Sequence, residues 1–195
     1  MNLNNLLSIE GKVALVTGGS RGIGEMIAAG FLANGAKVYI SSRKAEVCDA
    51  TAERLQQEFG GECLSIPANL AEIDGIQAAV AELEKRESKL DILVNNAGVS
   101  WGAPLGEFPE IGWDKVMDTN GKGVLFLTQA LLPLLEAAGT AEEPARVINV
   151  GSIDGIKTPM FDNFSYGPSK AAVHHLTRVL AAHLVKRKII VNGIA

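Results

Sequence analysis

Cysteine is scarce in this chain of 195 residues, which contains only Cys48 and Cys63. Two cysteines cannot staple a domain of this size, and they show neither a C-x-x-C spacing nor a neighbouring histidine cluster, which argues against a zinc site. His175 and His183 can share a helix face, but no carboxylate or cysteine lies in register with them. We therefore expect no metal site and two buried, inert thiols.

A surplus of basic residues is also missing. Lys and Arg number 18 against 22 Asp and Glu, for a formal net charge of −4, whereas a general nucleic-acid binder needs a basic face. The sequence therefore predicts no nucleic-acid partner. With 47% hydrophobic and 21% charged residues, the composition is that of an ordinary globular protein and is too apolar for intrinsic disorder.

No hydrophobic run is long enough to cross a bilayer. The longest strongly apolar stretch, residues 124–135, contains Thr128, Gln129 and Pro133, and it falls short of the about 20 apolar residues that a membrane helix needs. The first seven residues lack the basic region and the long apolar region of a secretory signal. We therefore expect no membrane span and a cytoplasmic location.

What the sequence does have is an alternation of short β-branched runs and longer helical segments. Several of the runs are continuously apolar, as in parallel strands that are covered on both faces. Short connections between such segments are typical of stacked βαβ units, whose right-handed crossovers make a doubly wound parallel sheet with helices on both faces. No linker divides the chain, so we predict a single α/β domain of the Rossmann type over residues 1–195. The expected strands are 12–17, 37–41, 62–66, 91–95, 146–150 and 189–194, and the expected helices are 23–34, 45–59, 73–87, 111–138 and 165–186.

Glycine is abundant, with 21 residues, and it is concentrated after the first predicted strand, in the segment TGGSRGIG at 17–24. Gly18 permits the turn out of the strand, Gly22 lets the backbone approach a pyrophosphate, and Gly24 lets the helix pack closely. The helix N-terminus then offers free N–H groups and a positive dipole end to phosphate. The pattern favours a dinucleotide site; the alternative is a glycine-rich turn without a ligand.

The second predicted strand is followed by Ser42 and Arg43, where an NAD-binding site usually has a carboxylate for the ribose 2′-hydroxyl. The guanidinium of Arg43 suits a 2′-phosphate by its charge and fork geometry, and Arg21 adds a second positive group. We therefore expect NADP(H) to be preferred over NAD(H). The alternative is that Arg43 is an ordinary solvated charge.

Three residues in the last third of the chain suggest a reaction. Ser152 follows the fifth predicted strand, whose carboxyl end would face the ligand crevice. Tyr166 and Lys170 lie on one helix face, and Pro168 places Tyr166 at the helix start. An ammonium lowers the pKa of a nearby phenol, and a serine hydroxyl can hydrogen-bond a carbonyl oxygen as charge develops on it. With hydride supplied by a nicotinamide, this set predicts carbonyl reduction, although a Y-x-x-x-K pair alone occurs by chance in many helices.

Together these motifs resemble the short-chain dehydrogenase/reductase family. The matching positions follow the family's order over nearly the whole chain and are Thr17-Gly18-x-x-x-Gly22-x-Gly24, Asn95-Asn96-Ala97-Gly98, Asn120, Ser152 and Tyr166-x-x-x-Lys170. Within the family, NNAGVSWGA at 95–103 and YGPSKAA at 166–172 are most similar to β-ketoacyl reductases of the rhamnolipid-biosynthesis type. That likeness implies a 3-oxoacyl thioester as substrate and NADPH as cofactor.

The family resemblance implies a catalytic tetrad. Tyr166 would be the acid and base, and Lys170 would lower its pKa and hold the nicotinamide ribose. Ser152 would polarise the carbonyl, Asn120 would anchor a water that links Lys170 to solvent, and residues 95–98 would shape the floor under the adenosine ribose and steady the sheet. The residues expected to contact the dinucleotide are Thr17, Gly18, Ser20, Arg21, Gly22, Ile23, Gly24, Ser42, Arg43, Asn69, Leu70, Asn96, Ala97, Gly98, Tyr166 and Lys170.

The sequence departs from the family pattern in two places. Asn69 and Leu70 follow the third predicted strand, where the family usually has an aspartate before an aliphatic residue; Asn69 can still hydrogen-bond adenine as acceptor and donor. Beyond the position of Ala195, family members continue with a Pro-Gly turn, a substrate-covering segment, a helix and a seventh strand. We therefore expect the usual last strand and lid segment to be absent and the reaction site to be wetter.

Three functions remain open at this point. They are an NADPH-dependent reductase of a small carbonyl or alcohol substrate, a non-catalytic dinucleotide-binding module, and an inactive truncated form that works only with another chain. The resemblance also implies a homodimer or homotetramer through the Leu/Ala-rich faces of residues 111–138 and 165–186. The alternative is that these faces merely cover the sheet.

Overall fold

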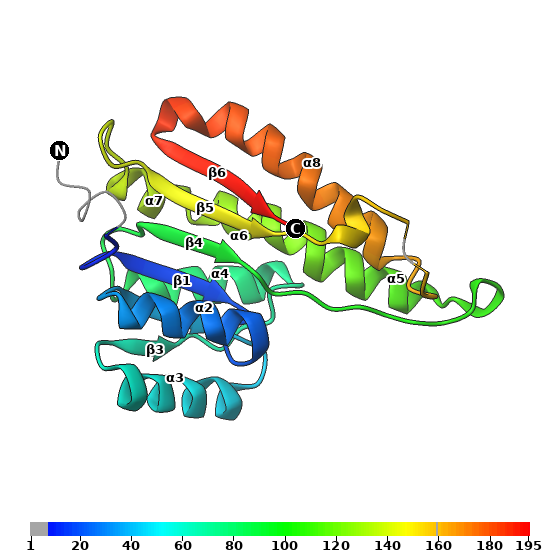
Figure 1. The fold of residues 1–195 in the computed structure, drawn as a ribbon, viewed down its shortest axis with the longest axis horizontal. Helices are drawn as coiled ribbons and strands as arrows, with labels where there is room; N and C mark the ends of the chain where they lie inside the picture. Colours follow the sequence, from blue (N-terminus) through cyan, green and yellow to red (C-terminus); the bar gives the residue numbers. More distant parts are fainter. Residues whose placement is uncertain (1–7, 159) are drawn as a thin grey trace.

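The computed structural model describes residues 8–158 and 160–195. Residues 1–7, where the sequence predicts no secretory signal, lie outside the described residues. The described chain forms a six-stranded parallel sheet in the order β3-β2-β1-β4-β5-β6 (Figure 1). This order confirms the predicted doubly wound α/β fold, because the chain starts in the middle of the sheet, winds out to one edge and then returns to build the other. The strands are β1 (Val13–Thr17), β2 (Lys37–Ser41), β3 (Cys63–Ser65), β4 (Ile92–Asn95), β5 (Ala145–Val150) and β6 (Ile189–Ile194).

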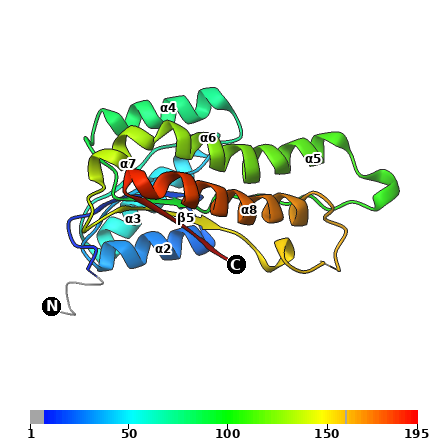
Figure 2. The same cartoon turned by 90° about the horizontal axis from the view of Figure 1, so that it is seen from above.

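Helices cover both faces of this sheet. Figure 2 shows α2 and α3 on one side and α4, α6 and α7 on the other. The α-helices are α2 (Gly22–Ala33), α3 (Ala45–Phe59), α4 (Ile73–Glu84), α5 (Glu110–Met117), α6 (Gly123–Ala130), α7 (Leu132–Ala138) and α8 (Tyr166–Leu184). The short 3-10 turns are η1 (Leu105–Glu107), η3 (Ile153–Gly155) and η4 (Val185–Arg187), and a π-type turn is η2 (Asp118–Lys122). None of the described helices is both long and apolar enough for a membrane span.

Strand β1 shows why the sheet needs two helical layers. All five of its residues are buried, and successive side chains point to opposite faces. Val13 and Leu15 belong to the core under α4, α6 and α7, which Leu184 of α8 also joins. Ala14 and Val16 belong to a second core under α2 and α3. The continuous apolar run in the sequence therefore becomes a strand with a core on each face.

The prediction of one helix over residues 111–138 is wrong, because the structure divides this segment into α5, η2, α6 and α7. The five residues of η2 form a π-type turn, which inserts extra backbone into the helix and redirects its side chains. A second break separates α6 from α7 at Leu131, two residues before Pro133. Proline has no N–H to donate and crowds the preceding turn, so a straight helix cannot continue through it.

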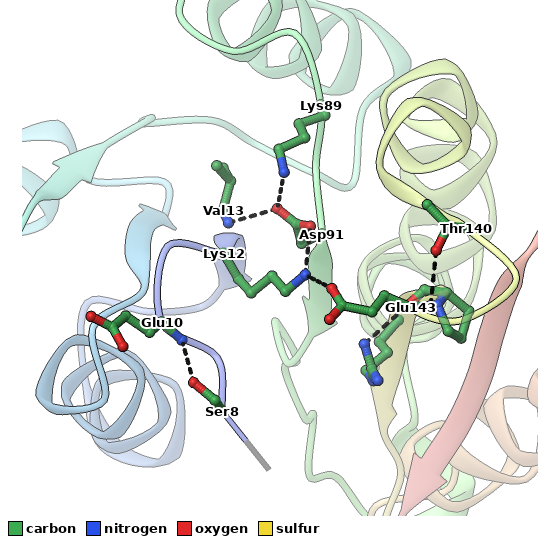
Figure 3. Close-up of polar contacts among 10 residues, drawn as sticks. Ser8, Glu10, Lys12, Val13, Lys89, Asp91, Thr140 and Glu143 are labelled. Carbon is green, nitrogen blue, oxygen red and sulfur yellow. Dashed lines mark hydrogen bonds and ion pairs between the residues drawn. The ribbon is translucent and has the colours of Figure 1, made fainter. Parts of the chain in front are cut away.

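A buried carboxylate ties the amino ends of the central strands together. Asp91, just before β4, accepts a hydrogen bond from the backbone N–H of Val13 at 2.9 Å, and its oxygens lie 3.7 Å from Lys12 Nζ and 3.6 Å from Lys89 Nζ (Figure 3). Lys12 also pairs with Glu143 in the loop before β5. These contacts hold together the amino ends of the central strands. The predicted site residues follow the carboxyl ends of the strands, at the opposite end of the sheet.

Candidate active site

A cleft of about 790 Å³ opens beyond the carboxyl ends of β4 and β5. The predicted site residues that line it are Ile23, Asn96, Gly98, Ser152, Tyr166 and Lys170. Residues that line it but were missed by sequence reasoning include Val99, Ser100, Ile153, Asn163 and Ile194. Val99 and Ser100 lie within the segment 95–103 that carries the family resemblance, but neither was given a role there. Ile153, Asn163 and Ile194 belong to no catalytic or cofactor motif, and only the fold brings them to the cleft.

Tyr166 and Lys170 lie side by side at the start of α8. Lys170 Nζ is 5.7 Å from the centre of the Tyr166 ring and donates a hydrogen bond to the carbonyl oxygen of Val150 at 2.8 Å. Only 5% of Lys170 is exposed. Burial disfavours its charged form and lowers the pKa of Lys170 to about 8. The geometry thus holds an ammonium beside a phenol. With a pKa of about 8, Lys170 can gain and lose its proton near neutral pH.

Ser152 lies just beyond β5 with an extended backbone, φ −167° and ψ 151°. Its Oγ accepts a hydrogen bond from the backbone N–H of Asp154 at 3.2 Å. A serine hydroxyl has one hydrogen to donate, and the Asp154 contact uses Oγ as an acceptor only. The hydroxyl hydrogen of Ser152 is therefore free to donate to a group bound in the cleft.

Asn120 lies within the π-type turn η2 and is only 1% exposed. Its side-chain amide makes two hydrogen bonds of 2.9 Å to the backbone N–H and C=O of Val99, and it donates a third to Ser169 Oγ at 3.0 Å. A Cβ at Gly98 would lie 3.5 Å from Asn120 Oδ1 and 3.6 Å from Lys170 Nζ, so both groups flank the same glycine. The structure thus has Asn120 holding the 98–100 segment against α8; its water-anchoring role stays a prediction.

The glycine segment between β1 and α2 forms a tight turn. Gly18 has φ +65°, and a Cβ there would lie 2.9 Å from Asn96 Nδ2. A Cβ at Gly24 would overlap the carbonyl oxygen of Gly18, so the helix approaches its own entry turn too closely for any side chain. Gly22 has φ +57° with no atom within 4 Å of where a Cβ would stand. This open backbone at the N-terminus of α2 suits a phosphate group.

Two predicted contact residues, Thr17 and Asn96, use their side chains to join β1 to the loop after β4. Thr17 Oγ1 donates to Val94 O at 3.2 Å and accepts from the backbone N–H groups of Asn96 and Ala97, each at 2.9 Å. Asn96 Nδ2 in turn donates to Thr17 O at 2.9 Å. Thr17 is only 1% exposed, so it positions the two loops and does not face the cleft. Ser20 is similarly buried, and its carbonyl accepts from Thr51 Oγ1 at 3.1 Å.

The ends of β2 and β3 carry the remaining predicted contacts. Ser42 Oγ is buried and has no hydrogen-bond partner among the described residues, and Arg43 and Arg21 are exposed. The exposed guanidinium of Arg43 suits the oxygens of a 2′-phosphate. Asn69 instead donates to Glu72 Oε1 at 2.6 Å within the turn before α4, and Leu70 is buried, so neither lines the cleft.

A buried polar chain beneath the site was found only in the structure. Asn95 Nδ2 donates to Asn149 Oδ1 at 2.8 Å and to Thr128 Oγ1 at 3.1 Å, and Asn149 Nδ2 donates to Thr177 Oγ1 at 2.9 Å. The chain runs from α6 through β4 and β5 to α8, and it therefore anchors α8, which carries Tyr166 and Lys170 of the cleft lining. The sequence signal for this polar chain was one asparagine near the end of each of two otherwise apolar strands, Asn95 in β4 and Asn149 in β5.

The comparison with protein families gives one match over residues 12–195, to a family described as short chain dehydrogenase. The chain is 52% identical over 188 residues to the rhamnolipids biosynthesis 3-oxoacyl-[acyl-carrier-protein] reductase of Pseudomonas aeruginosa, covering 96% of this chain and 73% of that protein. It is 35% identical over 198 residues to the 5-keto-D-gluconate 5-reductase of Escherichia coli, covering 99% of this chain and 74% of that protein.

Solved structures agree with these sequence matches. The Pseudomonas aeruginosa RhlG/NADP active-site complex superposes with a TM-score of 0.93 at 52% identity, covering 96% of this chain and 73% of that chain. The L-sorbose reductase of Gluconobacter frateurii, solved with NADPH and L-sorbose, gives a TM-score of 0.90 at 29% identity, covering 96% and 69%. The fold, the family match and these oxidoreductase relatives lead to one conclusion: the chain belongs to the short-chain dehydrogenase/reductase family.

Proposed function

We propose that this protein is an NADPH-dependent reductase that converts a ketone to a secondary alcohol. The observation that carries the proposal is the grouping of Tyr166, Lys170 and Ser152 around one cleft, with the Lys170 ammonium 5.7 Å from the Tyr166 ring. The proton donor, the cation that stabilises its anion and the carbonyl-polarising hydroxyl then all border the same cleft.

NADP(H) fits the site beyond the carboxyl ends of the strands. The Gly18–Gly24 backbone and the N-terminus of α2 would hold the pyrophosphate, and Ser42 with Arg43 would hold the 2′-phosphate. The NADP complex of the Pseudomonas relative and the NADPH complex of L-sorbose reductase support this cofactor. When bound, the dihydronicotinamide supplies the hydride that the carbonyl carbon receives.

The protein's own groups supply the rest of the chemistry. The Ser152 hydroxyl donates a hydrogen bond to the substrate carbonyl oxygen while its own Oγ accepts from Asp154 N. As the carbonyl carbon takes up hydride, the C=O π bond breaks, and the developing oxyanion takes the phenolic proton of Tyr166 to give the alcohol. The ammonium of Lys170 stabilises the tyrosinate that remains, which takes a new proton from solvent.

A 3-oxoacyl thioester is the substrate class that we favour. The Pseudomonas relative, at 52% identity, is named for 3-oxoacyl reduction. Ile153 lines the cleft, and the segment after it exposes Ile156, Met160 and Phe161, an apolar set that suits an acyl chain. Asn163 also lines the cleft, and its buried Oδ1 has no partner among the described residues, which leaves an acceptor for a polar part of the substrate.

The proposal is tested with Tyr166→Phe, which keeps the ring and removes the proton donor. We expect kcat for NADPH oxidation with a 3-oxoacyl thioester to fall at least about 100-fold, the scale of general acid catalysis. The other tyrosine, Tyr39, gives a matched control, because its hydroxyl bonds Glu87 at 2.7 Å far from the cleft. Tyr39→Phe should lower the melting temperature and leave kcat nearly unchanged.

Two other outcomes would replace the proposal. Quenching of tryptophan fluorescence by NADPH without any turnover would favour the alternative, a dinucleotide-binding module. Faster reduction of a keto-sugar acid than of any 3-oxoacyl thioester would move the substrate class toward that of the Escherichia coli relative.

We further propose a homodimer or homotetramer in the cytoplasm, assembled through α5, α6 and α8. Ile111 and Trp113 of α5, Phe126 of α6 and Val179 of α8 expose apolar surface that a second copy would bury. Sedimentation at micromolar concentration that shows only monomer would remove the oligomer from the proposal, and fractionation of cells tests the location.

A further inference from the structure

The imidazole of His174 contacts the backbone of Ser152. His174 Nε2 is 3.0 Å from the carbonyl oxygen of Ser152 and 3.5 Å from its backbone nitrogen. The same carbonyl oxygen also accepts from the N–H of Gly155 at 3.0 Å. His174 lies four residues after Lys170 on α8, so the helix face that carries Tyr166 and Lys170 continues onto this side chain.

The two contacts to Nε2 cannot both be hydrogen bonds at once, because a ring nitrogen carries either a hydrogen or a lone pair. A separation of 3.0 Å is a normal N–H···O length, whereas 3.5 Å lies beyond the usual range. The contacts therefore favour the tautomer with hydrogen on Nε2, which donates to Ser152 O. With the Gly155 N–H at 3.0 Å as the second donor, both lone pairs of that carbonyl are used.

Two glycines let the serine loop approach the ring this closely. A Cβ at Gly151 would overlap the His174 imidazole, and a Cβ at Gly155 would lie 2.8 Å from His174 Cδ2 and 2.6 Å from the carbonyl carbon of Lys170. The residues on either side of Ser152–Asp154 are thus pressed onto α8 along the stretch from Lys170 to His174. The orientation of Ser152 is set by this helix and not by β5 alone.

We propose that His174 is a positioning residue for Ser152. Its Nε2–H holds the Ser152 peptide in place, so that Oγ accepts from Asp154 N at 3.2 Å and the hydroxyl hydrogen is directed into the cleft. The inference rests on the proposed reductase function, because its consequence for catalysis passes through the carbonyl-polarising role of Ser152. His174 itself need not touch the substrate.

The test compares His174→Leu, which removes the donor, with His174→Gln, which keeps an N–H at similar reach. We expect His174→Leu to lower kcat by about 10- to 100-fold, because small misplacements of a reacting group cost this much, while the NADPH dissociation constant changes less than about 2-fold. His174→Gln should recover most of the loss. His175→Leu, at the exposed neighbouring position, is the control and should leave kcat unchanged.

A double-mutant cycle separates positioning from a general structural role. In a Ser152→Ala background, His174→Leu should cause little further loss of kcat, because the group that it positions is already gone. Losses that multiply in the double variant would overturn the inference, as would equal activities for His174→Leu and the unmodified protein.

A readout without turnover keeps the two proposals distinguishable. We expect ¹⁵N NMR of the His174 ring to show hydrogen on Nε2, and amide exchange of residues 151–155 to quicken in His174→Leu and much less in His174→Gln. An Nδ1–H tautomer, or exchange that is unchanged in His174→Leu, overturns the positioning role. If instead the unmodified protein reduces no ketone while the NMR and exchange results hold, the proposed function fails and the contact stands.

Discussion

Lys170 Nζ donates a 2.8 Å hydrogen bond to the carbonyl oxygen of Val150, the last residue of β5. One side chain thereby links α8 to the strand that leads to Ser152. The same nitrogen is 5.7 Å from the centre of the Tyr166 ring. The placement of the phenol relative to the serine loop therefore depends on a lysine that is almost fully buried.

The buried position of Lys170 predicts a pH dependence. Its pKa of about 8 means that the ammonium is present below pH 8 and is lost above it. Because the ammonium stabilises the tyrosinate that proton transfer leaves behind, we expect kcat/KM for ketone reduction to decline as pH rises through about 8, by up to about 10-fold per pH unit. The apparent value belongs to the Tyr166–Lys170 pair as a unit.

The matching variant for this pH profile is Lys170→Arg. Arginine keeps its charge throughout the accessible pH range, so the decline should move upward by at least about one pH unit, whatever the maximal rate. An unchanged pH profile in Lys170→Arg would mean that another group controls the decline.

Two glycine substitutions in α2 should have opposite effects. In Gly24→Ala, the new methyl group overlaps the Gly18 carbonyl, and we expect a loss of about 1–3 kcal/mol in unfolding free energy together with weaker NADPH binding. Gly30→Ala is the control, because it has open space around it on the same helix. It should gain up to about 1 kcal/mol. Urea unfolding and NADPH titration measure both; equal stabilities would contradict the packing of the turn.

Arg43 should decide between the two dinucleotides. In Arg43→Asp, a carboxylate replaces the exposed guanidinium, so a 2′-phosphate is repelled and a 2′-hydroxyl can be bonded. We expect the ratio of kcat/KM for NADPH to that for NADH to fall at least about 10-fold. Lys186→Asp makes the same change of charge in η4, which precedes the amino end of β6, and it should leave the ratio unchanged.

Asp91 should be important for stability and not for catalysis. Asp91→Ala leaves the Val13 N–H without its acceptor, takes the carboxylate away from Lys89 and leaves Lys12 with Glu143 alone, which should cost roughly 2–4 kcal/mol of unfolding free energy. Glu143, whose side chain is 65% exposed, is the control, and Glu143→Ala should cost under about 1 kcal/mol (Figure 3). The KM for NADPH should be unchanged in both variants, because the cluster lies at the amino ends of the strands and the cleft lies beyond their carboxyl ends.

Local sequence patterns predicted much of the fold. The strands at 37–41 and 189–194 and the helix at 45–59 have the predicted bounds, because apolar runs and helical periodicity are properties of neighbouring residues. The long helix predicted at 111–138 failed at two breaks. The π-type turn η2 has no comparable sequence signal, whereas Pro133 signals the break between α6 and α7.

The sequence by itself determined the order of strands and helices, the glycine turn after β1 and the helical spacing that places Tyr166 beside Lys170. These depend on residues within a few positions of one another, where spacing fixes geometry. Only the tertiary structure decided that Asn120 bonds Val99 across 21 positions, that Asp91 reaches Val13 across 78, and that His174 meets Ser152 across 22. Such contacts depend on how helices, strands and loops far apart in the sequence pack against one another, and no local sequence pattern specifies that packing.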